Sequence, residues 1–178
     1  MVFFITGGSR GIGEAVVLQA IREGHDVAFT YVKNENAANA VIKKAQAIAD
    51  AAGQKRVCKA YHLDVASSKE VESVGDEVNN DFETVDAVVC NAAINKDNLV
   101  FSMSDEEWGD VIQTNLTGSF YVVRQFLGGF LANRFGRFVF LSSIAQNGIS
   151  GQANYAASKA GLCGLSATLS KEYGRRGV

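Results

Sequence analysis

Tyr155 and Lys159 are the residues whose types and spacing most directly indicate chemistry. Residues four apart lie on the same face of a helix, so the lysine ammonium can lie beside the phenol. A cation beside a tyrosine stabilises the phenolate, and the tyrosine can then donate a proton to a carbonyl oxygen. The spacing alone is weak evidence. Ser142 and Ser143 strengthen it, because they end an apolar run, and ligands of open α/β sheets bind at the carboxyl ends of strands.

A glycine-rich turn, residues 6–13, follows the first apolar run and opens the first helical stretch. Glycines let the backbone approach a pyrophosphate, and a helix N-terminus offers N–H donors. The spacing is G-x-x-x-G-x-G rather than G-x-G-x-x-G, so a purely structural turn is the alternative. The position at the first strand–helix junction favours phosphate binding. The residues of this turn predicted to bind a cofactor are Thr6, Gly7, Ser9, Arg10, Gly11, Ile12 and Gly13.

The end of the second apolar run indicates which dinucleotide is bound. An NAD site usually places an acid about 20 residues beyond the glycines, where it binds the ribose 2′-hydroxyl. This chain has Tyr31, Val32 and Lys33 there. An acid would repel a 2′-phosphate, whereas Lys33 and Arg10 would attract one. The alternative is that both are solvated surface cations. We therefore predict that Tyr31 and Lys33 contact the cofactor and that NADP(H) is favoured over NAD(H).

Alternating apolar runs and helical stretches must position these groups. Strands are expected at residues 2–6, 27–31, 57–63, 85–90 and 138–142, and helices at 11–22, 35–52, 68–80, 105–133 and 153–173. Capping boxes begin at Ser67 and Ser104. Strands that are apolar on both faces and separated by helices indicate a parallel sheet with right-handed crossovers. We expect one Rossmann-type, doubly wound α/β domain over residues 1–178, with three α/β/α layers.

Composition excludes several classes of protein. The 178 residues are 47% hydrophobic and 20% charged, the balance of a soluble globular protein rather than a disordered one. The net charge of −2 gives no basic field for nucleic acid, and no apolar run has the roughly 18–20 residues of a membrane span. Three cysteines without a CxxC pattern predict a reducing, cytoplasmic location without disulfides. His25 and His62 lack partners at metal spacing, so no metal site is predicted.

The combined motifs resemble the short-chain dehydrogenase/reductase family over essentially the whole chain. They are residues 6–13, Asp64 with Val65, Asn91-Ala92-Ala93, Asn115, the pair Ser142 and Ser143, and Tyr155 with Lys159. Within that family, residues 136–143 and 151–161 are most similar to the 3-oxoacyl-(acyl carrier protein) reductases and acetoacetyl-CoA reductases. The resemblance implies NADPH-dependent reduction of a 3-oxoacyl thioester in fatty acid biosynthesis.

The resemblance also implies roles for single residues. Tyr155 protonates the substrate oxygen, and Lys159 makes it a stronger acid and binds the nicotinamide ribose. A serine polarises the carbonyl, and Asn115 positions a water that links Lys159 to solvent.

On the adenine side, Asp64 accepts from the amino group and Val65 donates its backbone N–H. Asn91, Ala92 and Ala93 line the cofactor. The family's Asn-Ala-Gly is Asn-Ala-Ala here, which should be tolerated if the φ angle of Ala93 is negative.

The serine assignment depends on which way the residues are counted. Ser142 lies 13 residues before Tyr155, the usual family spacing, whereas Ser143 lies 12 before it. Counting forward along the strand from Gly136 and Arg137 selects Ser143. Because loops absorb deletions more readily than strands do, we assign the catalytic role to Ser143.

Partners and length complete the expectations. The resemblance implies a homotetramer, and carrier-protein docking at Arg134 and Arg176, with solvated surface cations as the alternative for these arginines. Family members continue through further strands and a substrate-covering helix pair, so the chain is expected to be a truncated piece. If it were complete, the fifth strand would be an open sheet edge with exposed apolar faces. Two other functions stay open: reduction of another ketone, such as a sugar, a steroid or a polyketide, or a non-catalytic cofactor-binding subunit.

Overall fold

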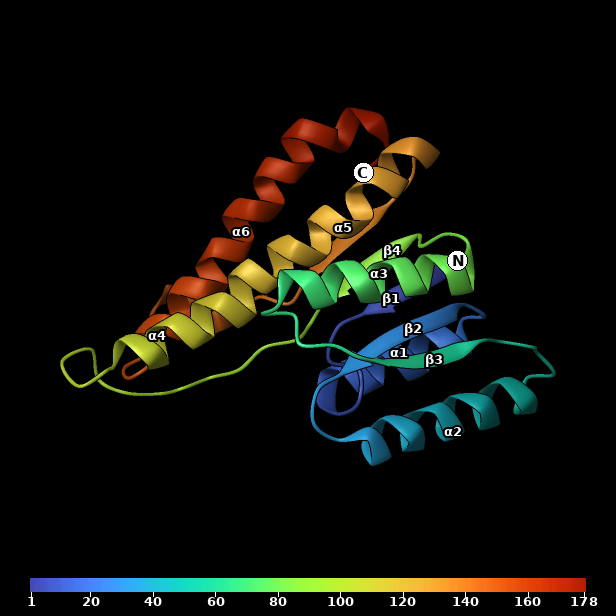
Figure 1. Cartoon of the computed structure of the whole chain (residues 1–178), viewed down its shortest axis with the longest axis horizontal. Coiled ribbons are helices and arrows are strands. Elements are labelled where there is room, and N and C mark those ends of the chain that lie inside the picture. Colours follow the sequence, from blue (N-terminus) through green and yellow to red (C-terminus); the bar gives the residue numbers. More distant parts are fainter.

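The computed structural model describes residues 1–178 and contains one parallel five-stranded sheet (Figure 1). The strands are β1 (Val2–Ile5), β2 (Asp26–Tyr31), β3 (Cys58–His62), β4 (Ala87–Cys90) and β5 (Arg137–Phe140), in the order β3-β2-β1-β4-β5. Phe4 in the central strand pairs with Ala28 on one side and Val88 on the other. The chain order reverses beside β1, so the carboxyl ends of β1 and β4 open a crevice there.

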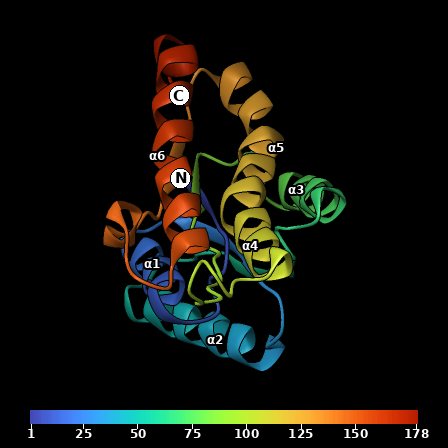
Figure 2. The same cartoon turned by 90° about the vertical axis from the view of Figure 1, so that its left-hand side faces the viewer.

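Helices cover both faces of the sheet, which confirms the expected three-layer α/β architecture (Figures 1 and 2). One face is covered by α1 (Gly11–Arg22) and α2 (Glu35–Ala51), and the other by α3 (Ser68–Phe82), α5 (Gly118–Asn133) and α6 (Ala153–Tyr173). Two buried clusters fill the layers. Ile5 and Phe29 belong to the α1/α2 side, and Phe4 and Phe126 to the α3/α5 side.

One of the two expected capping boxes forms as predicted. The Ser104 hydroxyl accepts from the Glu107 N–H, and the Glu107 carboxylate accepts from the Ser104 N–H at 2.8 Å. Ser67 caps α3 by accepting from the Glu70 N–H. The Glu70 carboxylate, however, accepts from the N–H of Asp64 at 3.1 Å instead of returning to Ser67. The second box is therefore replaced by a tie between α3 and the end of β3.

The long helix expected over residues 105–133 is continuous in the structure, but it contains a π-helical turn that the sequence did not predict. The segment divides into α4 (Asp105–Ile112), a π-helical turn η1 (Gln113–Thr117) and α5. Long-range hydrogen bonds fix the wide turn: the Gln113 amide donates to the Ala66 carbonyl, and the Asn115 side chain binds the backbone of Ile94. π-Turns of this kind are frequent at functional sites.

β5 is one of the two edge strands of the sheet, with β3 at the other edge, and it is buried on one face only. Phe138 packs on Phe130 with ring centroids 4.8 Å apart, whereas Val139 on the opposite face is 47% exposed. The strand ends at Phe140, two residues earlier than predicted. Ser142 and Ser143 follow it and lead into the 3₁₀ turn η2 (Ile144–Asn147).

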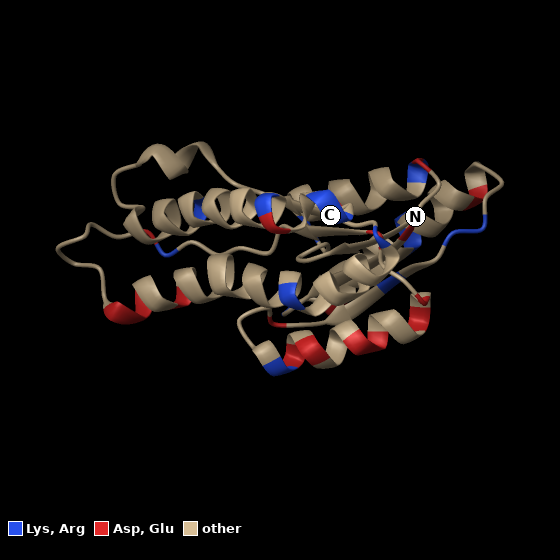
Figure 3. Cartoon of the chain, turned by 90° about the horizontal axis from the view of Figure 1, so that it is seen from above, with Lys and Arg blue, Asp and Glu red and all other residues tan.

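The surface carries both signs of charge. Figure 3 shows that acidic residues gather along α3 and at the start of α4, whereas basic residues are scattered over other helices and loops. No helix combines the length and the apolar character that crossing a bilayer requires.

Candidate active site

The glycine-rich turn is held against the ends of β2 and β4 by side-chain hydrogen bonds. The Thr30 hydroxyl accepts from the Gly7 N–H at 3.1 Å, and the Asn91 amide donates to the carbonyls of Thr6 and Gly7 at 2.8 and 3.0 Å. Thr6 is buried, and its hydroxyl accepts from the N–H groups of Asn91 and Ala92. Thr6 and Asn91 thus fix the turn from behind.

Gly7 and Gly13 are two of the positions at which the turn needs glycine. Gly7 has a φ angle of +69°, in the left-handed region that glycine favours. A Cβ atom on Gly13 would overlap the carbonyl of Gly7 and the amide of Asn91, so only glycine lets α1 begin this close to the turn. No side chain caps α1, and its first N–H groups are therefore free to bind an anion.

A cavity of about 750 Å³, called the main cavity here, opens beside this turn and spans the ends of β1, β2, β3 and β4. Twelve predicted cofactor residues line it: Gly7, Ser9, Arg10, Gly11, Ile12, Tyr31, Lys33, Asp64, Val65, Asn91, Ala92 and Ala93. Four others do not, namely Thr6, Gly13, Tyr155 and Lys159. Thr6 and Gly13 support the turn, and the last two lie on α6.

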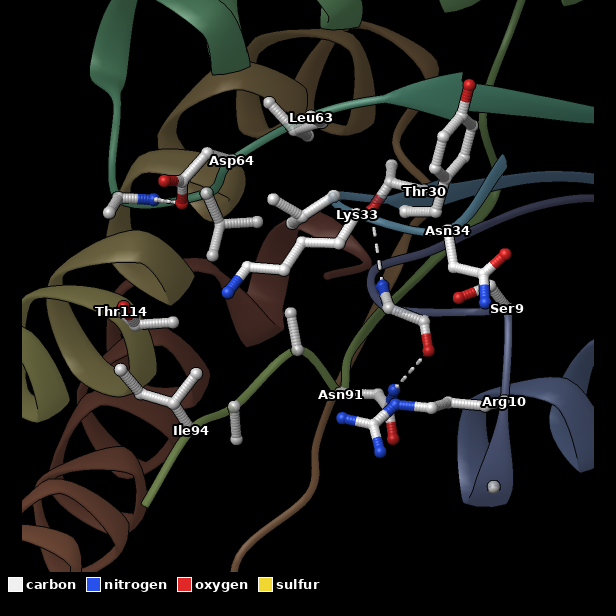
Figure 4. Close-up of a pocket in the computed structure, with 18 of the residues that line it drawn as sticks. Ser9, Arg10, Thr30, Lys33, Asn34, Leu63, Asp64, Asn91, Ile94 and Thr114 are labelled. Atoms are coloured by element: carbon white, nitrogen blue, oxygen red, sulfur yellow. Dashed lines mark hydrogen bonds between the residues drawn. The ribbon is translucent and has the colours of Figure 1, made fainter. Parts of the chain in front are cut away.

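Two cations line the main cavity without an acidic partner. Arg10 and Lys33 are exposed, and neither takes part in an ion pair. Figure 4 shows Lys33 extended across the cavity and the Arg10 guanidinium on the side of Asn91. Two unpaired cations beside an uncapped helix N-terminus suit a ligand with several phosphates. The residues present therefore fit a phosphorylated dinucleotide.

The opposite wall of the cavity offers hydrogen-bonding groups to a base. Asp64 lies just beyond β3, and one of its carboxylate oxygens accepts from the Ala66 N–H at 2.9 Å. The N–H of Val65 has no hydrogen-bond acceptor within the chain. An acceptor and a free donor on adjacent residues can together bind one edge of an aminopurine.

Lys159 is a buried cation on α6, 3% exposed, that faces both the end of β5 and Tyr155. Its Nζ donates to the carbonyl of Leu141 at 2.7 Å and lies 5.5 Å from the centroid of the Tyr155 ring. Burial lowers the pKa of the Lys159 ammonium. The helix therefore places the ammonium beside the half-buried tyrosine, as the four-residue spacing predicts.

Asn115 connects α6 to the main cavity. It is 1% exposed and lies in η1, where its side chain accepts from the Ile94 N–H and donates to the Ile94 carbonyl. The same amide donates to Ser158 at 3.1 Å, and the Ser158 hydroxyl donates to the carbonyl of Tyr155 at 2.7 Å. Ile94 lines the main cavity, so one chain of hydrogen bonds joins its wall to the tyrosine.

The two candidate serines make different contacts. The Ser142 hydroxyl lies within hydrogen-bond distance of the Gln146 side chain and of the Lys159 carbonyl, at 3.0 and 3.1 Å. The Ser143 hydroxyl accepts from the Ala145 N–H at 3.1 Å and donates to no group in the chain. Its proton is free for a ligand, which favours Ser143 as the group that polarises a carbonyl.

Two further expectations concern single positions. Ala93 is not among the residues with a positive φ angle, so the condition for tolerating alanine in place of glycine is met.

Arg134 and Arg176 are both exposed, and Gly177 packs against the carbonyl of Arg134, which brings the two arginines to the same end of the molecule.

Several residues with roles at the site were not predicted from the sequence. Thr30 holds the glycine-rich turn, and Ser158 and Asn154 contact the backbone of Tyr155. A small polar residue inside an apolar strand is the only signal that marks Thr30. Gln113 and Thr114 also line the main cavity, and the unexpected π-turn places them there.

Comparison with known proteins gives a consistent result. The family model described as short chain dehydrogenase matches residues 1–178. Three proteins named 3-oxoacyl-[acyl-carrier-protein] reductase FabG are similar to the chain: 40% identity over 175 residues for Staphylococcus epidermidis, 38% over 178 for Escherichia coli and 36% over 178 for Haemophilus influenzae. The matches cover 98–99% of the chain and 69% of each relative. The chain therefore belongs to the short-chain dehydrogenase family of oxidoreductases, which use a nicotinamide cofactor.

Proposed function

We propose that the protein catalyses the NADPH-dependent reduction of a 3-oxoacyl thioester to the 3-hydroxyacyl thioester. The observation that carries the proposal is the buried Lys159 ammonium, 5.5 Å from the Tyr155 ring and beside the end of β5, where Ser143 has an unused proton donor. The relatives that are 36–40% identical are named for the same reaction class, which supports this choice of substrate.

Each polar group has a distinct task in the proposed reaction. When bound, NADPH would supply the hydride that reduces the carbonyl carbon. The Tyr155 hydroxyl donates its proton to the carbonyl oxygen, and the Lys159 ammonium stabilises the phenolate that remains. The Ser143 hydroxyl donates a hydrogen bond to the same oxygen and polarises the carbonyl. Asn115 holds η1 against Ile94 and, as in the family, positions a water that leads from Lys159 to solvent.

The preference for NADPH rests on Arg10 and Lys33. Neither side chain has an acidic partner, and both line the main cavity at the end where the family binds the ribose phosphate. A charge-assisted hydrogen bond to the 2′-phosphate stabilises the complex by about 1.5–3 kcal/mol. NADH has no 2′-phosphate and cannot form this bond.

The remaining parts of the proposal concern organisation and partners. Residues 1–178 form one cofactor-binding domain of a cytoplasmic enzyme that assembles as a homotetramer. The acidic acyl carrier protein docks at Arg134 and Arg176, whose shared position suits electrostatic steering.

A substrate panel tests the proposal. The wild-type protein is assayed for cofactor oxidation with a short 3-oxoacyl thioester, a keto sugar and a ketosteroid, each with NADPH and with NADH. We expect the highest kcat/KM with the thioester and NADPH. Faster reduction of another ketone would assign a different substrate to the same site. Tight NADPH binding without reduction of any ketone would overturn the proposal in favour of a non-catalytic subunit.

A further inference from the structure

Asn154 directly precedes Tyr155 and is 0% exposed. Its Nδ2 donates to the carbonyls of Lys96 and Glu107 at 2.9 and 3.0 Å, and its Oδ1 accepts from the N–H of Tyr155 at 2.7 Å. Both amide hydrogens and one lone pair of the oxygen are thus in use. Among side chains of this length, only asparagine offers two N–H donors and an acceptor.

The three partners of Asn154 come from three parts of the site. Lys96 belongs to the segment after β4, which also carries Ile94 of the main cavity. Glu107 lies in the first turn of α4, and Tyr155 in the first turn of α6. Other contacts hold the same segment: the Asn98 N–H donates to the Gly151 carbonyl at 2.8 Å, and Lys96 pairs with Asp110 at 2.6 Å. Asn154 is the buried side chain at the centre of this junction.

These contacts fix the backbone of Tyr155 relative to the cavity wall. Its N–H is held by Asn154, and its carbonyl is held by Ser158, which in turn bonds to Asn115. Both supporting side chains are 0% exposed. A buried polar group that loses its partner is destabilised, so the junction resists displacement of the tyrosine.

We propose that Asn154 is a positioning residue that holds the Tyr155 hydroxyl at the substrate carbonyl. The inference rests on the proposed role of Tyr155 as the proton donor. Proton transfer requires donor and acceptor within hydrogen-bond reach, and a displacement of about 1 Å can lower a rate by about 10²-fold. Loss of Asn154 should therefore slow the reaction without removing any group that touches substrate or cofactor.

Three single variants test the inference in the thioester assay. Asn154→Ala removes all three hydrogen bonds, and Asn154→Ser keeps one donor. Asn133→Ala is the matched control. Asn133 is an exposed asparagine at the C-terminal end of α5, and its amide donates to the hydroxyl of Thr84. Activity is expressed per folded molecule, with the folded fraction taken from thermal melting curves.

A positioning role and a merely structural role predict different results. For Asn154→Ala we expect kcat to fall about 10- to 100-fold, with the NADPH Kd changed less than about twofold. Asn154→Ser should lie between wild type and Asn154→Ala, and Asn133→Ala should match wild type. A purely structural role would lower the melting temperature and leave kcat per folded molecule within about twofold of wild type, which would overturn the inference. If Asn154→Ala does not fold, Asn154→Ser is judged by the same criteria.

The double variant Asn154→Ala/Tyr155→Phe gives the sharper readout. If Asn154 acts through the tyrosine hydroxyl, the double variant should be slower than Tyr155→Phe by no more than about twofold. Losses that multiply would show that Asn154 acts independently of that hydroxyl and would contradict the inference. A fully active Tyr155→Phe would instead refute the proposed function, so the two failures are distinguishable.

Discussion

The main cavity and the surroundings of Tyr155 use their polar groups in opposite ways. In the main cavity, the cations Arg10 and Lys33 and the N–H of Val65 have no partner within the chain. Around Tyr155, the side chains of Asn115, Asn154 and Ser158 are buried and hydrogen-bonded. Unpaired groups are available to a ligand, whereas paired buried groups fix a geometry. Substitutions in the cavity should therefore change affinity, and those near the tyrosine should change turnover.

The largest effect is expected from Tyr155→Phe. The variant keeps the aromatic ring and its packing but deletes the transferable proton, so kcat should fall by about 10²–10⁴-fold. The NADPH Kd should stay at the wild-type value, because the hydroxyl is not among the groups that line the main cavity. Steady-state kinetics and fluorescence titration measure the two quantities. Tyr173→Phe, at the other end of α6, is the matched control. Retention of more than about a tenth of the turnover would refute general acid catalysis by Tyr155.

The two serines give the next largest difference. Ser143→Ala removes the free hydroxyl proton and should lower kcat by about 10²–10³-fold, the usual effect of losing one donor to a developing oxyanion. Ser142 bonds to groups of the protein itself, so Ser142→Ala should cost much less. Parallel kcat measurements decide between them. The opposite order of losses would mean that Ser142 is the catalytic serine. The residue that this chain lacks relative to the family would then be missing from the strand rather than from the loop before Tyr155.

In the main cavity, Lys33→Ala should raise the NADPH Kd by about 10- to 150-fold, since one charge-assisted contact is lost. The NADH Kd and the kcat at saturating NADPH should change little. Lys43→Ala serves as the control, because Lys43 is an exposed lysine of α2 outside the cavity. Equal effects on NADPH and NADH would show that Lys33 does not bind the 2′-phosphate.

The smallest expected effect concerns stability. Lys159→Met should abolish activity yet raise the melting temperature of the cofactor-free protein by about 2–4 °C per kcal/mol gained. The gain follows because desolvating an ammonium costs several kcal/mol, more than the roughly 1–3 kcal/mol for leaving the Leu141 carbonyl unpaired. A lower melting temperature for Lys159→Met would contradict this balance.

The difference in stability between the wild-type protein and Lys159→Met should depend on pH, and the direction of that dependence can be predicted. Burial lowers the pKa of Lys159 in the folded protein below its ordinary value of 10.5, so the unfolded chain binds more protons between the two values. Wild-type stability should therefore rise relative to Lys159→Met as the pH increases through that window. Melting curves of both proteins at a series of alkaline pH values test this prediction. A melting-temperature difference that does not change with pH would contradict a lowered pKa of Lys159.

The sequence predicted the elements that local patterns encode. All five strands and the first, second and last helices lie within one or two residues of their expected bounds, because apolar runs and end glycines are local signals. The glycine-rich turn and the Tyr155–Lys159 pair were recognisable for the same reason. The π-turn was not, because Asn115 and Gln113 find partners 21 and 47 residues away.

The supporting residues of the site were missed for a similar reason. Asn154 is one polar residue in a helix, and its role appears only when the segment 58 residues earlier is folded against it. Thr30 likewise depends on a contact with Gly7, 23 residues earlier. Sequence patterns thus predict which groups do chemistry more readily than they predict which groups hold them in place.

Transfer of a labelled hydride tests the central claim most directly. The wild-type protein is incubated with a 3-oxoacyl thioester and NADPH that carries deuterium at both C4 positions of the nicotinamide, and the product is analysed by mass spectrometry. Hydride transfer to the carbonyl carbon predicts one deuterium at C3 of the 3-hydroxyacyl product. Absence of the product, or a product without deuterium at C3, would contradict the assignment of this protein as an NADPH-dependent 3-oxoacyl thioester reductase.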